Sequence, residues 1–277
     1  MNIKIPSLVA DMAKELFAIA PNHLESFLIS AVFPEDKVDM PVSELQQLGD
    51  EDHQVNVIPV KGVLMDESHP NHGIFGYRAM AEAHINGENN PKVLAHVLYI
   101  NSPGGGVSGL AEFADQIHSS SKPVYAYIDK LGASAAYYIA AAAGHIMTSS
   151  RSSLIGNIGS KMSTFDLMGI LENWGAKRVE VYGTKATHKD LGFKEAKEGK
   201  PEKLRSIMVD PMNEMFVQDL AKYRPTLSED FKNGMVYFSE DALSKKLVDS
   251  LGTYADLLNH IASDLQIKQS SQMSKKV

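Results

Sequence analysis

The sequence predicts an α/β domain built around a parallel sheet. From Val55 onward, short apolar segments typical of strands alternate with longer segments of helical periodicity. The segment Val93–Ile100 is almost entirely apolar, which is typical of a strand buried on both faces of a parallel sheet. Helices that connect such strands form right-handed crossovers, and we expect the same connection here.

The first 50 residues differ from the rest of the chain. Leu8, Met12, Leu16 and Ile19 recur with helical spacing, and two prolines later interrupt the pattern. We therefore predict an N-terminal helical arm over residues 1–50.

Residues 51–262 carry the predicted α/β domain, and residues 263–277 are expected to form a polar tail. In chain order the predicted elements are strand Val55–Val60, loop Asp66–Gly76, helix Tyr77–Ile85, strand Val93–Ile100, helix Val107–Ile117, strand Val124–Ile128, helix Ser134–Ala143, strand Ile146–Thr148, helix Glu202–Tyr223 and a helix that includes Leu243, Leu247 and Val248.

Composition excludes several classes of function. The formal net charge of -7 disfavours a nucleic-acid partner, and the absence of cysteine excludes disulfides, thiolate zinc sites and a cysteine nucleophile. The longest apolar stretch, Leu131–Ala143, is shorter than the roughly 20 residues of a membrane span. Asp11, Lys14 and Glu15 interrupt any signal-peptide core. We expect a soluble, cytoplasmic protein without a membrane partner.

A glycine-rich turn follows the apolar strand. Ser102-Pro103-Gly104-Gly105-Gly106 runs from the strand into a helix, and glycines allow the backbone to approach a ligand closely. The segment lacks the Lys-Ser/Thr of a phosphate loop and the spacing of a dinucleotide fingerprint. An oxyanion hole made of backbone N–H groups is the better use, with a tight turn as the structural alternative.

Ser134 begins an alanine-rich helix among small residues, in Gly132-Ala133-Ser134-Ala135-Ala136-Tyr137-Tyr138. Small neighbours allow a substrate carbonyl to reach the hydroxyl, although a serine at a helix start is usually only an N-cap. Two more segments follow: the glycine-punctuated Ser153–Ser160, and Gly183–Gly192, which contains Lys185 and Lys189. Alone, these two are a turn and a charged surface loop.

Together and in this order, the four segments resemble the signal peptide peptidase A family of Ser-Lys serine proteases. The family includes membrane-bound bacterial enzymes and soluble head-maturation proteases of tailed phages, and the resemblance covers about residues 55–260. The Ser-Pro-Gly-Gly turn is shared with Clp-type proteases and crotonase-like enzymes. The resemblance therefore implies a crotonase/Clp-like α/β fold with a parallel sheet and flanking helices.

The resemblance also implies roles for individual residues. Ser134 matches the nucleophile, Lys189 matches the general base, and the N–H groups of Gly105 and Ala135 match the oxyanion hole. No cofactor or metal is implied. Burial would have to lower the pKa of the lysine before it could accept a proton.

Four positions, in three segments, depart from the family pattern. Ala135-Ala136 replaces Gly-Gly after the serine, Asn157 replaces a serine, and Lys185 stands where a glycine is expected. We expect the changes at Ala135-Ala136 and Asn157 to tune activity rather than abolish it. Lys185 remains a rival base, and His188 is the candidate base of a conventional triad.

The implied function is that of a serine endopeptidase, in particular a phage or prophage capsid maturation protease. Expected partners are protein or peptide substrates, with capsid and scaffold proteins among them, and further copies of the chain in a homo-oligomer. In some family members the serine and lysine come from neighbouring subunits. The alternatives are a cytoplasmic bacterial peptidase of the same family, a crotonase-like acyl-CoA enzyme and a non-catalytic scaffold.

Overall fold

The structure is a computed structural model of the full chain. It describes residues 17–19, 43–69, 74–149, 151–163, 179–228 and 233–267, with single positions 173, 175 and 177. The strands are β1 Phe17–Ile19, β2 Glu44–Leu48, β3 Asp50–Met65, β4 Phe75–Gly76, β5 Val93–Gly106, β6 Val124–Ala133, β7 His145–Thr148, β8 Leu154–Gly156, β9 Val236–Phe238 and β10 Ser250–Leu251. The helices are α3 Tyr77–Glu88, α4 Leu110–His118, α5 Ala135–Ala141, α7 Leu191–Lys197, α8 Glu202–Leu204, the π-helical turn η2 Arg205–Val209, α9 Asp210–Tyr223, α10 Ser239–Ser244 and α11 Tyr254–Asp264.

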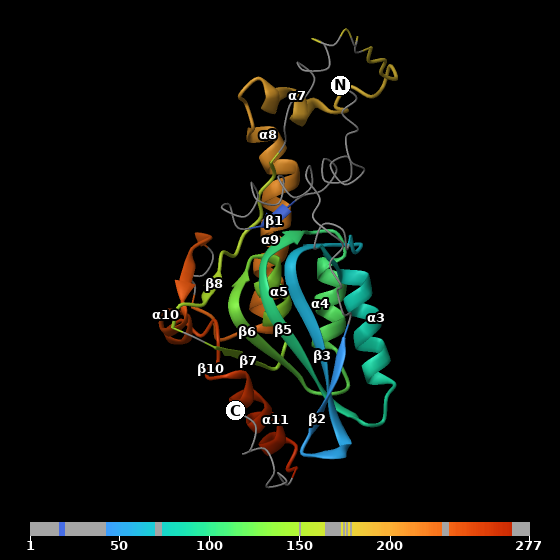
Figure 1. The fold of residues 1–277 in the computed structure, drawn as a ribbon. Helices are drawn as coiled ribbons and strands as arrows, with labels where there is room; N and C mark the ends of the chain where they lie inside the picture. The colour runs from blue at the N-terminus through green and yellow to red at the C-terminus, as the bar shows by residue number, and fades with distance from the viewer. Residues whose placement is uncertain are drawn as a thin grey trace.

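The main sheet has the strand order β10-β7-β6-β5-β3-β2. Pairing is parallel from β10 to β3, and β2 pairs with β3 in the antiparallel direction. Helices α3, α4 and α5 lie beside these strands (Figure 1). The predicted α/β class with a parallel sheet and flanking helices is confirmed.

The central strands are buried on both faces, as the apolar run Val93–Ile100 predicts. Leu98 and Ile100 belong to the large core, which includes residues of α3, α4, α5 and α9. Val97, from the other face of the same strand, joins a second core with Leu257 and Ile261 of α11. Neighbouring residues in a strand point to opposite faces, so one apolar strand fills both cores.

The N-terminal prediction is wrong where the structure describes it. Residues 17–19 and 44–48 are strands rather than helix, because each pairs with a strand edge that would otherwise be open: β1 with β5, and β2 with β3. The rest of the predicted arm lies outside the described residues, as does most of the predicted polar tail. Helix α11 ends at Asp264, so residues 263 and 264 belong to a helix.

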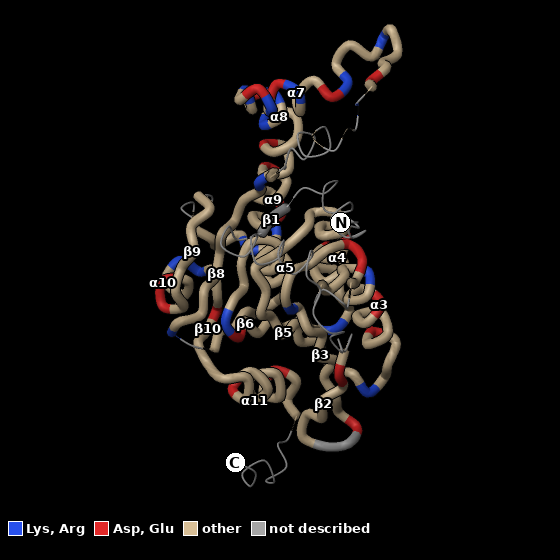
Figure 2. The backbone as a smooth tube through the Cα atoms, turned by 45° about the horizontal axis from the view of Figure 1, so that its top comes forward, with Lys and Arg blue, Asp and Glu red and all other residues tan. Residues whose placement is uncertain are grey.

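The predicted helix Glu202–Tyr223 is interrupted by η2, and it projects away from the sheet. Helices α7 and α8 lie at its far end, well separated from α5 and the strands (Figure 1). Figure 2 shows basic and acidic residues interspersed on α7 and α8. We call residues 179–209 the extension. None of the helices within the described residues has the length and apolar character that a membrane span requires.

The hydrogen bond of the Tyr137 hydroxyl is predicted to stabilise the packing of α5 in the core. It is fully buried and donates a hydrogen bond of 2.8 Å to the Leu247 carbonyl. Tyr137→Phe leaves that carbonyl without its partner, so we expect the free energy of unfolding to fall by about 1–3 kcal/mol in urea titration. Tyr125→Phe is the control, since its hydroxyl bonds to the half-exposed Asp264 and should cost less. An equal loss in both variants would contradict this reasoning.

Candidate active site

Ser134 lies at a sharp turn between β6 and α5. Its backbone angles are φ 57° and ψ -123°, and its residue surface is 1% exposed. A non-glycine residue in this region costs on the order of 1–3 kcal/mol, and such strain is concentrated at functional sites. The turn has the geometry of a nucleophile elbow, in which a strand-to-helix turn presents a serine hydroxyl.

The surrounding backbone keeps this turn in place. The Ser134 N–H donates to the Gly156 carbonyl at 2.7 Å, and the Ser134 carbonyl accepts from the Tyr138 N–H at 2.9 Å. Helix α5 is buried along its whole length. The Tyr138 hydroxyl donates a hydrogen bond to Asp219 of α9. The centroids of the Tyr138 and Phe216 rings lie 4.7 Å apart in an edge-on arrangement. Helix α9 therefore holds the helix that begins at the strained serine.

The glycine-rich segment is the end of β5 rather than a separate loop. A Cβ on Gly105 would lie 1.8 Å from the Leu64 carbonyl oxygen, so only glycine allows β3 and β5 to pair here. Ser102 supports the segment: its hydroxyl donates to the Gly62 carbonyl at 2.6 Å and accepts from the Gly104 N–H at 3.1 Å. The Tyr77 hydroxyl donates to the Gly106 carbonyl at 2.6 Å.

Strand register places Ser134, Gly105 and Ala135 at the carboxyl end of the parallel sheet. The last register pair of the parallel strands β5 and β6 is Ser102 with Gly132. Gly105 and Ala135 each lie three residues beyond that pair. The three residues therefore follow the point where the two adjacent strands stop pairing, at the carboxyl end of the sheet, where α/β sheets place their ligands.

The third segment of the sequence motif lies against the same edge. Strand β8 pairs with the end of β6, with Gly156 opposite Ala133. Asn157 has φ 49°, and its N–H donates to the Met235 carbonyl at 2.7 Å. Asparagine tolerates this left-handed conformation better than most residues, which explains why it can replace the serine of the family pattern.

The structure does not bring Lys189 to Ser134 within one chain. Lys185, His188 and Lys189 are exposed in the extension, in the turn before α7. Helix α7 lies far from α5 in both views (Figures 1 and 2). The assignment of the base therefore remains a prediction.

Sequence reasoning missed Lys161, which follows β8 by five residues. It is partly buried, and burial lowers its pKa. The preceding Ser160 lines a small apolar pocket between the start of α4, α5 and α9, and its hydroxyl has no partner among the described residues. The pocket is lined by Val107, Leu110, Ala111, Tyr138, Ser160, Met212, Met215 and Phe216. Lys161 directly follows the segment Ser153–Ser160, whose pattern gave no signal for a base.

Residues 116–268, more than half of the chain, match the sequence profile of Peptidase family S49. The chain belongs to peptidase family S49.

Relatives of this S49 chain come from several groups of organisms. A Methanocaldococcus jannaschii protein named as a protease is 30% identical over 181 residues, which cover 63% of this chain and 57% of the relative. Protease 4 of Salmonella typhi is 28% identical, and the match covers 78% of this chain and 35% of the relative. Capsid assembly protease C of Escherichia phage lambda is 26% identical, and the match covers 78% of this chain and 50% of the relative. The chain thus spans between 35% and 57% of the length of these relatives.

Among solved structures, the chain is similar to a membrane-bound stomatin-specific protease in complex with a substrate peptide. The TM-score is 0.46 with 15% identity, covering 76% of this chain and 80% of that one. An enoyl-CoA hydratase of Mycobacterium avium paratuberculosis gives a TM-score of 0.48 with 12% identity, covering 81% and 76%.

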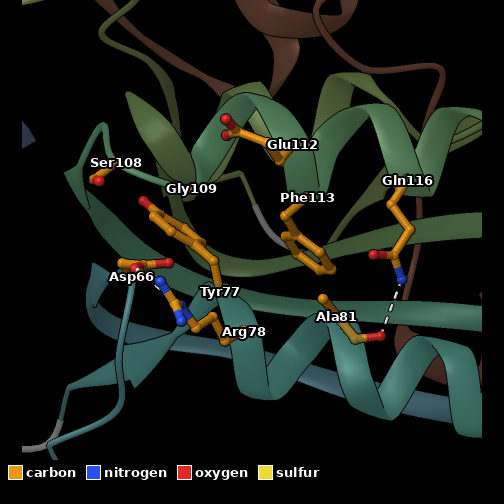
Figure 3. A pocket seen from close by; sticks show the side chains of 9 residues that line it. All are labelled: Asp66, Tyr77, Arg78, Ala81, Ser108, Gly109, Glu112, Phe113 and Gln116. Carbon is orange, nitrogen blue, oxygen red and sulfur yellow. Dashed lines mark hydrogen bonds and ion pairs between the residues drawn. The ribbon is translucent and has the colours of Figure 1, made fainter.

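The chain has an open cavity of about 390 Å³ between α3 and α4 (Figure 3). Helices α3 and α4 form its walls, and an ion pair of 2.8 Å between Arg78 and Asp66 lies at one end. The Gln116 side chain donates to the Ala81 carbonyl at the other end. Ser134 does not line this cavity, so the cavity is not where the nucleophile would act.

One group among the described residues has ligand atoms spaced for a metal: His84, Glu88 and His96. The Asn56 amide donates to the Ala83 carbonyl and meets His96 Nδ1 at 3.2 Å, so this ring nitrogen must accept. The proton therefore lies on His96 Nε2, which faces Glu88 Oε1 at 2.9 Å.

His84 is fixed in the same tautomer. The Gln116 amide donates to the Ala81 carbonyl and meets His84 Nδ1 at 2.9 Å, while His84 Nε2 faces the Ser120 hydroxyl at 3.1 Å. A metal-binding Nε2 needs its proton moved to Nδ1 and donated to an acceptor. Both Nδ1 atoms face amide donors here, so these residues do not fit a metal. The cluster also lies about 30 Å along β5 from Gly105.

This cluster predicts a pH-dependent stability. Burial, then the neighbouring His84, lowers the pKa of His96 from 6.5 to about 4. Between pH 6.5 and pH 4, His96 binds a proton in the unfolded chain but not in the folded chain. Its contribution to the free energy of unfolding is therefore fully present above pH 6.5 and is lost as the pH falls toward 4. We expect a loss of at most about 1.4 kcal/mol per pH unit from this residue.

Urea titrations between pH 7 and pH 5 measure this slope. Burial alone would raise the pKa of Glu88, but hydrogen bonds from Ser121, Ser120 and His96 hold it at about 2, so Glu88 stays ionised throughout. His96→Gln should give a shallower slope, whereas His118→Gln, at an exposed position, should keep the wild-type slope. Parallel slopes for wild type and His96→Gln would contradict the assignment.

Proposed function

We propose that this protein is a serine endopeptidase in which Ser134 attacks the peptide carbonyl. The observation that carries the proposal is the strained conformation of Ser134, at the turn where β6 stops pairing with β5 and enters α5. An N-cap serine would not need φ 57°, and its side chain would accept a hydrogen bond from the first turn, which Ser134 does not. Membership of family S49 supports the same chemistry.

The reaction proceeds by acyl transfer. The Ser134 Oγ forms a bond to the carbonyl carbon while its proton passes to a lysine Nζ, and the carbonyl oxygen becomes an oxyanion. The N–H groups of Gly105 and Ala135 stabilise this charge, typically by about 3–4 kcal/mol for each donor. The C–N bond then breaks as the lysine returns the proton to the leaving amine. Water hydrolyses the acyl-enzyme by the reverse sequence of proton transfers.

We assign the base to Lys189 of a neighbouring copy of the chain. The extension carries Lys189 away from its own Ser134, so a dyad with this residue requires a second subunit. The extension also exposes four large apolar residues, Val179, Val181, Phe193 and Ile207, with exposed fractions of 83%, 91%, 39% and 57%. Apolar residues gathered on a projecting segment favour a protein interface, and in a homo-oligomer they bind a second copy.

The proposed biological role is capsid maturation in a phage or prophage, with capsid or scaffold proteins as substrates in the host cytoplasm or the prohead. The support is similarity to capsid assembly protease C of phage lambda and to the head-tail preconnector protein GP5 of phage P21. The alternative is a bacterial peptidase of the same family. Portal and capsid genes beside this gene would support the phage role, and bacterial housekeeping genes on both sides would contradict it.

Two substitutions of Ser134 separate the effect of its backbone strain on stability from the effect of its hydroxyl on activity. Ser134→Ala and Ser134→Gly should each lower the rate of casein cleavage by about 10³-fold or more. Glycine tolerates positive φ, so Ser134→Gly should also raise the free energy of unfolding by about 1 kcal/mol relative to Ser134→Ala. A fluorophosphonate should label wild type and the control Ser119→Ala but neither Ser134 variant. Undiminished cleavage by a Ser134 variant would refute the proposal, as would labelling of neither wild type nor control.

Subunit mixing tests the source of the base. Ser134→Ala and Lys189→Met chains should each be inactive alone, and their co-expression should restore part of the wild-type activity. Restoration follows because some interfaces then combine Ser134 of one chain with Lys189 of the other.

Lys161→Met is the matched comparison. Lys161 would act as the base within the chain that carries the attacking serine, whereas the proposed Lys189 comes from a second chain. If Lys161→Met is inactive and Lys189→Met retains full activity, the base is not Lys189. If Lys189→Met is inactive but mixing restores nothing, the dyad does not form between subunits.

A further inference from the structure

Strand β1 pairs with the segment proposed to bind the oxyanion. Phe17, Ala18 and Ile19 lie opposite Gly106, Gly105 and Gly104 in the antiparallel direction (Figure 1). A short strand from the N-terminal part of the chain therefore contacts the backbone of the candidate site.

Register shows which edge of β5 this strand occupies. Strand β3 already pairs with one edge, through Val63 opposite Gly104 and Leu64 opposite Gly105. On the other edge, β6 follows β5 only as far as the pair of Ser102 and Gly132, and then turns into Ser134. A strand has two edges, so β1 takes the edge that β6 leaves, next to the nucleophile turn.

An extended peptide that adds to an exposed strand edge is a general mode of peptide recognition, with main-chain hydrogen bonds providing the affinity. A substrate of the proposed peptidase needs its backbone extended beside Ser134 and its carbonyl near Gly105. We propose that residues 17–19 occupy the substrate-strand position of the active site and compete with substrate for it. This inference rests on the proposed function.

The expected competition is moderate. A three-residue strand is at the short end of the range for strands and makes few hydrogen bonds. Because the strand is covalently part of the same chain, its pairing with β5 is intramolecular, which allows a weak contact to compete with a free substrate. A substrate that pairs along a longer stretch displaces it.

Proline substitutions in the full-length chain test the contact through the backbone. Ala18→Pro/Ile19→Pro removes two neighbouring N–H groups, and alternate N–H groups of a strand point to opposite edges, so a ladder donor is lost. Ala18→Ser/Ile19→Val keeps both N–H groups and is the matched control. The proline variant should show a KM for a decapeptide substrate at least threefold lower than the control, an unchanged kcat, and faster labelling of Ser134 by a fluorophosphonate.

A synthetic peptide with the sequence of residues 13–24 should reverse the effect. It should inhibit the proline variant competitively, raising KM without changing kcat. Intact-mass measurement of wild type and Ser134→Ala runs alongside. A Ser134-dependent cut within the N-terminal segment also supports the proposal, because a strand in that position lies within reach of the nucleophile.

The outcomes separate this inference from the proposed function. Equal KM values and equal labelling rates in the proline variant and its control overturn the inference while leaving the peptidase intact. A proline variant with a raised KM overturns it as well. Absence of labelling in every variant, wild type included, refutes the proposed function instead.

Discussion

The candidate site depends on where the parallel pairing of β5 and β6 stops. The two strands stay in register up to Ser102 and Gly132 and then separate. Beyond this point β5 continues against β3 through Gly104 and Gly105, while β6 turns sharply into α5 at Ser134. The separation leaves an edge of β5 that β6 does not cover and that β1 occupies instead. Had β6 continued in register, its backbone would cover Gly105 and leave no edge for a peptide.

Two kinds of packing maintain this arrangement. Gly105 is required because the Leu64 carbonyl occupies the space of a side chain, and this close approach fixes the glycine segment to the sheet. The strain at Ser134 is offset by α5, whose residues are all buried and whose Tyr137 and Tyr138 hydroxyls bond to segments more than 80 residues away. Long-range contacts therefore hold a local conformation that the backbone would not adopt alone.

How far the sequence could predict the structure depends on the range of the interactions involved. The strand Val93–Ile100 and the helix after Ser134 follow from local patterns, and the structure confirms them, whereas the segment predicted as a glycine turn continues strand β5 to Gly106. Residues 17–19 and 44–48 could not be predicted as strands, because their conformation comes from distant strand edges rather than from their own periodicity. The role of Lys189 could not be decided either, since neither its sequence position nor one folded chain brings it to the serine. Lys161 gave no sequence signal because its burial arises from tertiary packing.

The proposed mechanism and the position of β1 have a common consequence for the isolated chain. Its serine lacks a nearby Lys189, and its substrate edge is paired with its own residues 17–19. A serine hydroxyl without a base is a poor nucleophile, and an occupied edge excludes a weakly binding peptide. Assembly would supply the base, and a long extended substrate would displace the short strand. On the proposed mechanism, both conditions would restrict hydrolysis to places where many copies of the chain and an unfolded or extended substrate are held together, as the proposed role in capsid maturation requires.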